Sequence, residues 1–451
     1  MESSAKSVIL KVKTFLSHNI LKNIGWLFFD RIFRLGVGLI VGVWIARYLG
    51  PESFGKWNYA IALTSLLSTF ALMGLDSLIV RDIINNPDDK PKILGTSLFI
   101  RVVGSLFVTV ISCLIVFFTD RKDSQLLMIV FLTSFSYIFL AFDVIDFYFQ
   151  SRIESKYTVI AKFIAFIVSS CFRVIALLFK LALTSFVILA LIEVFLGACF
   201  LIYFYIKQTK FNPLKWSINI NFLRQKLKEA WPLILSGMVI MIYMRIDQIM
   251  LKQLIDEKTV GIYSAAVRIS ELWYVIPMTI STSVYPSLIA LKGKDNILYL
   301  KRFEQLYSVF FIISFGIGVL VTIFSTNIIG SLYGPKYFES AFILKINIWA
   351  GVFVFLGVAS SNYTVMENLN KISFYKTLLG AVCNIVLNFI LIPKYAGMGA
   401  AIATLISYGI AAYLSNLFFS ETRFLFWSMN RAIINSFRFS TYKLYDKKVI
   451  Q

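Results

Sequence analysis

About twelve apolar stretches, separated by short polar connectors, occupy almost the whole chain. Roughly 20 apolar residues in a helix are enough to cross the ~30 Å hydrocarbon layer of a bilayer. Stretches of this length are predicted to span a membrane near residues 24–46, 57–80, 94–118, 125–149, 157–179, 184–206, 231–251, 261–290, 303–325, 339–366, 372–392 and 398–420. The sequence therefore predicts an all-α polytopic membrane protein.

The composition supports a membrane protein. Hydrophobic residues make up 58% of the chain and charged residues only 15%, and the mean hydropathy is +0.77. These values lie outside the range of soluble domains. The longest polar stretches, residues 207–229 and the tail after Glu421, are too short to form a folded extramembrane domain. All four cysteines fall in apolar stretches, where thiols act as small hydrophobes, so we expect neither a disulfide nor a metal site.

The positions of Lys and Arg predict the orientation. Short cytoplasmic loops retain basic residues, and here alternate connectors, above all residues 207–229 and the C-terminal tail, carry most of them. Both termini are therefore predicted to be cytoplasmic, which requires an even number of spans. The formal charge of +20 reflects mainly this topology, together with attraction to anionic membrane lipid, and we expect no nucleic-acid partner.

The two halves of the chain look related. Residues 49–60 and 254–266 align when Gly55 is set on Gly261, and each segment joins the first and second spans of a six-span half. Internal repeats of this kind are common in transporters. We predict an N-terminal six-helix bundle over residues 1–206, a basic cytoplasmic linker over 207–229, a C-terminal six-helix bundle over 230–420 and a basic cytoplasmic tail over 421–451.

Four segments carry a resemblance to a known family. Residues 44–55, 245–251, 260–266 and 392–404 resemble the bacterial polysaccharide flippases of the Wzx type, which handle O-antigen and capsule repeat units. Each motif consists largely of small and apolar residues, but their order and their places relative to the spans make the match fairly specific. That family belongs to the superfamily of multidrug, oligosaccharidyl-lipid and polysaccharide exporters.

The resemblance implies a fold and a function. It implies twelve or so helices in two bundles around a central cavity, in the bacterial cytoplasmic (inner) membrane. It also implies translocation of undecaprenyl-pyrophosphate-linked oligosaccharide from the cytoplasmic to the periplasmic or outer leaflet by alternating access. Assembly with a polysaccharide polymerase and a chain-length regulator is implied in the same way.

Basic residues inside the spans predict where an anionic substrate binds. Moving an unpaired charge through hydrocarbon costs several kcal/mol, so we expect a cationic, hydrated groove. An Arg inside a span usually faces the bundle interior, and its planar fork suits phosphate. The alternative is that an Arg only forms an ion pair, either with an acid on another helix or, as the four-residue spacing of Asp30 and Arg34 allows, on one face of its own helix. We expect substrate binding by Arg31, Arg34, Arg173, Arg245 and Arg268.

Acidic residues form a second set inside the spans. Asp143, Asp146 and Gln150 share one helical face. Such carboxylates can bind a proton or sodium ion that drives transport, as in an antiporter, or act only as ion-pair partners. Asn384 and Asn388, one turn apart, are expected to bond between helices. The candidates for ion coupling or salt bridges are Asp30, Asp143, Asp146, Asp247 and Glu271.

Enzymatic functions fit poorly. The single histidine, His18, precedes the first span, and no Gly-rich phosphate loop is present, so we predict no catalytic residue and no cofactor. A membrane polysaccharide polymerase would carry a large outer loop. A cation-coupled small-molecule or drug antiporter of the same superfamily should have an acidic, aromatic cavity. Lipid II flippases usually carry about two extra helices, for which no room is left after Ser420.

Overall fold

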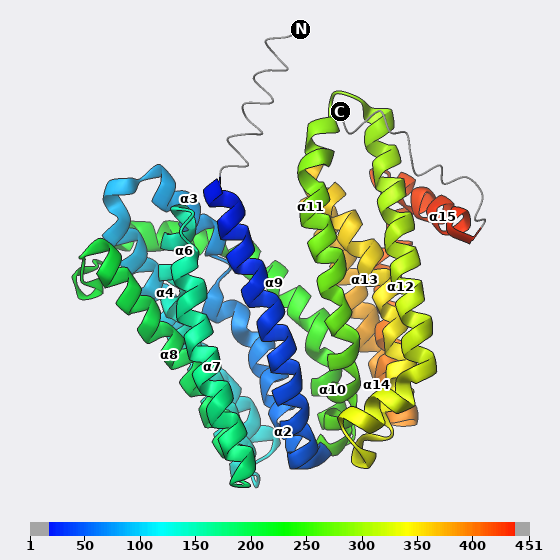
Figure 1. The fold of residues 1–451 in the computed structure, drawn as a ribbon, viewed down its shortest axis with the longest axis horizontal. Coiled ribbons are helices and arrows are strands. Elements are labelled where there is room, and N and C mark those ends of the chain that lie inside the picture. Colours follow the sequence, from blue (N-terminus) through cyan, green and yellow to red (C-terminus); the bar gives the residue numbers. More distant parts are fainter. Residues whose placement is uncertain (1–17, 438–451) are drawn as a thin grey trace. The chain divides into compact units, whose positions relative to one another are not determined.

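The computed structural model describes residues 18–437, and this part of the chain consists of helices and connecting turns (Figure 1). The predicted all-helical class is confirmed. Contacts divide the chain into two compact units, Met1–Met241 (unit 1) and Ile242–Gln451 (unit 2). The division falls inside helix α9 (Ile220–Leu254), beyond the predicted basic linker.

Unit 1 contains seven helices and the first part of α9 among the described residues. The predicted linker contributes a short irregular stretch and then the first turns of α9. The unit 1 elements are α2 (His18–Leu72), α3 (Asp76–Asn85), η1 (Pro87–Asp89), α4 (Lys90–Thr119), α5 (Ser124–Leu140), η2 (Ala141–Asp143), α6 (Val144–Ser151), α7 (Lys156–Leu178), α8 (Leu183–Thr209) and η3 (Pro213–Lys215).

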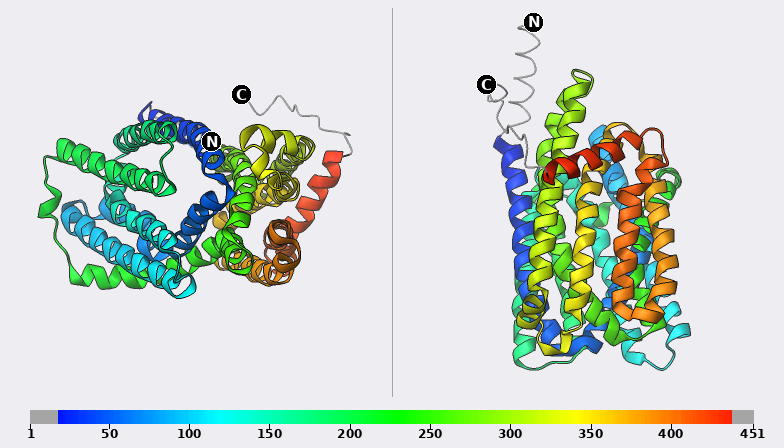
Figure 2. Two further views of the ribbon diagram at one scale, coloured as in Figure 1. Left: turned by 90° about the horizontal axis from the view of Figure 1, so that it is seen from below. Right: turned by 90° about the vertical axis from the view of Figure 1, so that its right-hand side faces the viewer.

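Unit 2 contains the rest of α9 and the helices that follow it. The predicted eighth span, 261–290, is two helices separated by a 3-10 turn. The elements are α10 (Glu257–Glu271), η4 (Leu272–Tyr274), α11 (Val275–Leu291), α12 (Asn296–Leu332), η5 (Pro335–Tyr337), α13 (Ser340–Met366), α14 (Asn370–Ala412), η6 (Leu414–Leu417) and α15 (Arg423–Phe437). Figure 2 shows α15, in red, lying across the long helices of this unit.

Ten helical segments of the described chain are long and apolar enough to cross a membrane. Two of them, Phe28–Asn85 with 58 residues and Asn370–Leu417 with 48, far exceed the roughly 20 residues that one crossing needs. Both contain a residue with non-helical backbone angles, so each consists of two helical arms. The exact number of crossings and the side on which the termini lie stay predictions.

The two breaks have local causes. In α2, Gly50 has φ +78°, which glycine adopts without strain, and Pro51 follows with no N–H to donate. Figure 1 shows the two arms of α2 in dark and lighter blue. In α14, Ala396 has φ +47° three residues after Pro393. Both breaks fall in segments that carry the family resemblance.

Buried aromatic and aliphatic side chains hold each unit together. In unit 1 the core joins α3, α4, α6 and α8, and includes Leu94 and Phe149. In unit 2 it joins α12, α13 and α15, and includes Phe303 and Phe355. Because these clusters are internal to each unit, each half has a core of its own.

Large apolar side chains also cover the outside of the helices. Phe118, Leu178 and Phe179 are 73%, 76% and 75% exposed. A soluble protein rarely leaves so many large apolar groups in water, whereas hydrocarbon solvates them at no cost. The surface of the helices therefore agrees with a multi-pass membrane protein.

Candidate substrate and ion sites

Unit 1 contains a group of charged side chains on otherwise apolar helices. Arg34 Nε on α2 donates to Asp30 Oδ1 at 2.7 Å, as the four-residue spacing allows. The Arg34 guanidinium also lies 5.2 Å from the centroid of the Phe166 ring on α7. We call the whole group the unit 1 charge cluster, and its members are Asp30, Arg34, Asp143, Asp146, Lys162, Arg173 and Glu193.

Lys162 on α7 connects the cluster to η2 and α6. Its Nζ lies 2.8 Å from Asp143 Oδ1 and 3.8 Å from Asp146 Oδ2. Gln150 donates to Asp146 Oδ2 at 3.1 Å, so the predicted shared face of Asp143, Asp146 and Gln150 forms. Lys162 lies inside the predicted span 157–179 but was not predicted to bind substrate. Its place in the middle of an apolar stretch was the available signal.

Arg173 on α7 completes the cluster by pairing with α8. Its Nη2 lies 2.8 Å from Glu193 Oε2. Within this cluster, two buried guanidinium nitrogens, Arg34 Nη2 and Arg173 Nε, have no hydrogen-bond partner among the described residues. Buried donors are normally satisfied, so these two are available to a bound acceptor.

A cavity of about 170 Å³ opens among these charges. Arg34, Asp143, Lys162 and Glu193 line it, and Phe139, Leu140, Ala165 and Gly197 are among the residues that form its apolar walls. The space is large enough for several water molecules or a small polar group. Arg31 is exposed on α2 and is not among the lining residues.

The cluster differs from the expected cationic groove. Each of its three cations already pairs with a carboxylate, and four carboxylates face three cations. The predicted Arg34, Arg173, Asp30, Asp143 and Asp146 are therefore brought together, but as ion pairs in which carboxylates outnumber cations. A charge at membrane depth is costly without a partner, which explains this pairing.

Unit 2 contains a different polar site around Asp247 on α9. Asp247 is only 4% exposed. Its Oδ2 accepts hydrogen bonds from Tyr263 Oη at 2.6 Å and Thr404 Oγ1 at 2.5 Å, and its Oδ1 accepts one from Asn388 Nδ2 at 2.6 Å. We call Asp247, Tyr263, Asn384, Asn388 and Thr404 the unit 2 carboxylate cluster. It joins α9, α10 and α14.

The partners of Asp247 in the described chain are all neutral. Asn388 Nδ2 also contacts Asn384 Oδ1 at 3.1 Å, while Asn388 Oδ1 and Asn384 Nδ2 have no partner there. A space of about 10 Å³ borders Asp247, Tyr263 and Thr404, enough for about one water molecule or a small cation. As predicted, Asn388 bonds between helices, but the sequence pattern did not identify Asp247 as its partner.

The remaining predicted residues of unit 2 lie on α9 and α10. Arg245 Nη1 is 3.6 Å from Glu271 Oε1, a long ion pair between the two helices. Arg268, one turn before Glu271, is half-buried. The predicted Arg245 and Glu271 are thus neighbours, while Asp247 has neutral hydrogen-bond partners of its own.

Comparison with known proteins adds independent information. The family described as polysaccharide biosynthesis protein matches residues 20–292, and the MatE family matches residues 232–390. The capsular polysaccharide biosynthesis protein CapF of Staphylococcus aureus is 23% identical over 87% of this chain and 97% of its own length. The probable flippase AglR of Haloferax volcanii is 25% identical over 84% of this chain and 79% of its own.

Solved structures share the fold. The lipid II flippase MurJ in its inward closed conformation superposes with a TM-score of 0.69 at 18% identity and covers 94% of both chains. An inward-facing multidrug resistance MATE transporter of the MOP superfamily superposes with a TM-score of 0.66 at 14% identity, covering 90% of this chain and 96% of its own. The architecture is therefore that of membrane flippases and exporters.

Proposed function

The chain belongs to the polysaccharide biosynthesis protein family, and from this premise we propose that it is a flippase for lipid-linked glycans. Its substrate is undecaprenyl-pyrophosphate-linked oligosaccharide, which it moves from the cytoplasmic to the outer leaflet by alternating access. The capsular polysaccharide protein and the flippase among its relatives support the glycan class. Anionic lipid, a polymerase and a chain-length regulator are proposed partners.

The unit 1 charge cluster carries the proposal. The lipid tail of such a substrate can stay in the bilayer, but the pyrophosphate must pass through a region where an unpaired charge is costly. Arg34 and Lys162 line the cavity, and Arg34 Nη2 and Arg173 Nε are buried donors without partners in the described structure. Guanidinium groups bind phosphate oxygens with two parallel hydrogen bonds, which fits these spare donors.

Binding then proceeds by exchange of partners. The pyrophosphate displaces carboxylates such as Asp30 and Glu193 from their cations, and the displaced carboxylates take up protons or bind a cation. The charge of the site stays nearly constant, because each displaced carboxylate is neutralised as the negative charge of the pyrophosphate enters. Substrate binding is thereby linked to proton or cation uptake without any bare charge inside the membrane.

The other predicted arginines contribute at different places. Arg245, with its long contact to Glu271, exchanges partners more easily than Arg34 does, and Arg268 lies one turn before Glu271 on the same helix. Arg31 is exposed, which suits a first contact with the substrate rather than its tight binding.

The unit 2 carboxylate cluster is the proposed site of ion coupling. A buried carboxylate with only neutral partners is stable when it is protonated or when it holds a small cation. Oxygens of Asp247, Asn384, Tyr263 and Thr404 are hard ligands suited to an ion such as sodium. We propose that Asp247 binds the driving ion and releases it during each transport cycle.

One reconstitution experiment tests the function. The protein is placed in liposomes with undecaprenyl-pyrophosphate-linked oligosaccharide, and the pH and sodium gradients are set independently. We expect facilitated movement between leaflets that responds to one of the two gradients. Absence of movement under every gradient would contradict the proposed substrate.

A second candidate function has its own observation. The MatE family matches residues 232–390, most of unit 2, so a small-molecule antiporter of the same superfamily is the alternative. Gradient-driven export of small organic cations in the same liposomes, without movement of the lipid-linked glycan, would favour it. The arginines of unit 1 would then be structural ion-pair partners.

A further inference from the structure

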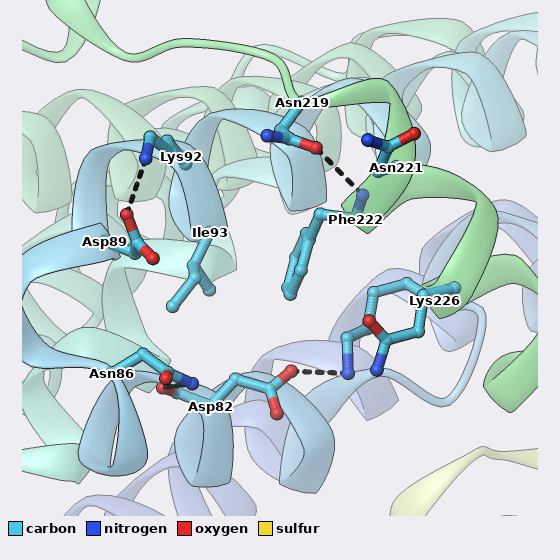
Figure 3. Close-up of a pocket in the computed structure, with 10 residues that line it drawn as sticks. Asp82, Asn86, Asp89, Lys92, Ile93, Asn219, Asn221, Phe222 and Lys226 are labelled. Atoms are coloured by element: carbon cyan, nitrogen blue, oxygen red, sulfur yellow. Dashed lines mark hydrogen bonds and ion pairs between the residues drawn. The ribbon is translucent and has the colours of Figure 1, made fainter.

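A second pocket in unit 1, of about 300 Å³, has no part in the transport steps proposed above. Figure 3 shows its two walls: the end of α3 with η1 and the start of α4 on one side, and the start of α9 on the other. Its volume lies at the lower end of the range for small-ligand sites. The basic residues at positions 81–92 and 207–228 place this end of unit 1 on the predicted cytoplasmic side.

Ion pairs around a buried lysine fix one side of the pocket. Lys226 on α9 is 1% exposed, and its Nζ lies 2.7 Å from both Asp82 Oδ2 and Glu229 Oε2. Arg81 Nη2 lies 3.3 Å from Asp82 Oδ1 and 3.2 Å from Glu229 Oε2. Removing one partner of a buried ion pair is strongly destabilising. These four residues therefore fasten the first turns of α9 to α3.

The connector before α9 is fastened to α4. The Asn219 N–H donates to Thr96 Oγ1 at 2.9 Å, and Asn219 Oδ1 accepts the Phe222 N–H at 3.0 Å, which caps α9. Ser217 approaches Gly95 so closely that a Cβ there would lie 2.5 Å from the Ser217 carbonyl oxygen. The pocket is thus preformed from two sides, as a selective binding site requires.

The lining residues select for a neutral, hydrogen-bonding ligand. The charges are paired with each other, Lys92 with Asp89 at 2.7 Å and Lys226 with Asp82, so no spare charge is left for an ion. The remaining polar groups are amides, whose NH2 groups carry two hydrogens and whose oxygens accept two hydrogen bonds. Asn86 and Gln225 each donate one internal hydrogen bond and Asn219 accepts one, which leaves further donors and acceptors for a ligand. These amides belong to Asn86, Asn219, Asn221 and Gln225.

An aromatic ring completes this arrangement. Phe222 is half-buried, and Figure 3 shows its ring directed into the pocket between Ile93 and Lys226. No hydrogen bond of the Asn221 amide is found within the described residues, and the side chain is exposed at the rim. Convergent amides around an apolar ring match the chemistry of a sugar, which presents hydroxyl groups at its edge and C–H groups on its face.

We infer that this pocket binds a sugar residue of the lipid-linked oligosaccharide on the cytoplasmic side and so selects the glycan before it is transported. The inference rests on the proposed function for the identity of the glycan. While the lipid tail lies in the cytoplasmic leaflet, the sugars beyond the pyrophosphate lie in water at this end of the molecule. Hydrogen-bonding sites discriminate strongly, because a ligand that lacks a hydroxyl leaves polar groups of the site unpaired.

The first experiment measures binding without transport. The oligosaccharide is released from its lipid pyrophosphate, and saturation-transfer NMR detects its contact with the full-length protein in detergent. We expect the double variant Asn86→Ala/Asn221→Ala to reduce the transferred signal by about fivefold or more, consistent with the loss of two net hydrogen bonds. Asn435→Ala, which changes an exposed asparagine of α15, is the matched control and should leave the signal unchanged.

The second experiment measures selection in liposomes. The double variant should move full-length lipid-linked oligosaccharide about tenfold more slowly, yet move the same lipid trimmed to one sugar within about twofold of wild type. Equal slowing of both lipids, slowing of neither, or an unchanged NMR signal would overturn the inference. If the wild-type protein binds the released glycan but flips no lipid, the inference of a sugar-binding pocket is supported and the proposed flippase function is contradicted.

Discussion

The unit 1 charge cluster and the unit 2 carboxylate cluster treat buried charge in opposite ways. In unit 1, Arg34, Lys162 and Arg173 each lie within 2.8 Å of a carboxylate oxygen. In unit 2, Asp247 is more deeply buried than any of these three cations. Its partners in the described structure are nevertheless two hydroxyl groups and an amide. One site therefore balances charge with charge, and the other stabilises a carboxylate with neutral dipoles alone.

Under the proposed function, the difference predicts different ligands for the two sites. A cation in an ion pair can exchange its carboxylate for a phosphate without changing the total charge, when the displaced carboxylate takes up a proton or a cation. A carboxylate surrounded by hydroxyl and amide groups lacks a cation, so it gains most from a proton or a small metal cation. We therefore expect substitutions in unit 1 to change substrate binding, and substitutions in unit 2 to change ion dependence.

The largest effect is expected from Asp247→Asn. The amide keeps the size of the side chain but removes the charge that holds the driving ion, so gradient-driven flipping should fall by about tenfold to a hundredfold. Initial flipping rates with and without each gradient measure this. Ser407→Ala is the control, because Ser407 lies on α14, the helix that carries Asn388 and Thr404, and its hydroxyl donates to the backbone of that helix, at Ala403 O. An Asp247→Asn protein that still responds to the gradient would break the proposed division of roles.

The next largest effect is expected from Arg34→Gln, which tests whether the ion pairs of the unit 1 charge cluster bind substrate or only stabilise the fold. Arg34→Gln should slow flipping by about tenfold or more, because a charge-assisted hydrogen bond contributes roughly 1.5–3 kcal/mol. It should also lower the melting temperature, since Asp30 loses its partner.

The double variant Asp30→Asn/Arg34→Gln separates the two roles. Removing both charges should restore the melting temperature, because no unpaired carboxylate is left. Flipping should stay slow, because the phosphate ligand is still absent. Recovery of flipping together with stability would show that Arg34 is only a structural partner.

A smaller effect is expected from Thr404→Val, which keeps the shape of the side chain but removes one hydroxyl from Asp247. The ion concentration for half-maximal flipping should rise about tenfold, the equivalent of one lost hydrogen bond. Thr404→Ser keeps the hydroxyl and should behave like wild type. A change in maximal rate at unchanged ion dependence would place Thr404 outside the ion site.

The smallest effect is expected at an ion pair outside both clusters. Asp123 caps α5 through the Leu126 N–H at 2.9 Å and lies 2.6 Å from Lys56 Nζ. Burial alone would raise the pKa of Asp123, but these contacts outweigh it and hold the pKa below its usual value. Its contribution to stability is therefore present above the unfolded pKa of about 3.9 and is lost as the pH falls through the lower folded pKa.

Asp123→Ala should accordingly cost about 1 kcal/mol of stability near neutral pH, and this difference should shrink at strongly acidic pH. Thermal unfolding in detergent across this range measures it. Asp123→Asn retains the cap and should lose less. Flipping should be unaffected in both variants, and a transport defect here would show that loss of any ion pair impairs the protein, which would weaken the comparison of the two clusters.

Several features of the structure could be predicted from the local sequence pattern. The apolar stretches predicted the helices, because length and hydropathy depend on neighbouring residues only. The spacing of Asp30 and Arg34 predicted that they meet, and the structure brings them within 2.7 Å. The face shared by Asp143 and Asp146 follows from helical periodicity in the same way.

Other features depended on contacts between distant segments. The sequence marked Asp247 as a buried acid, but its partners on α10 and α14 lie 16, 141 and 157 residues away. Lys162 is one of many lysines in the chain, and only the packing of α7 against η2 and α6 makes it the partner of two carboxylates.

The sequence by itself thus determined that the chain is helical, spans a membrane and carries charges inside its spans. It did so because the cost of exposing backbone or charge to hydrocarbon acts residue by residue. The tertiary structure decided which charges neutralise each other, which carboxylate keeps only neutral partners and where amides converge on a pocket. Side-chain pairing across helices depends on their packing, which no short stretch of sequence specifies.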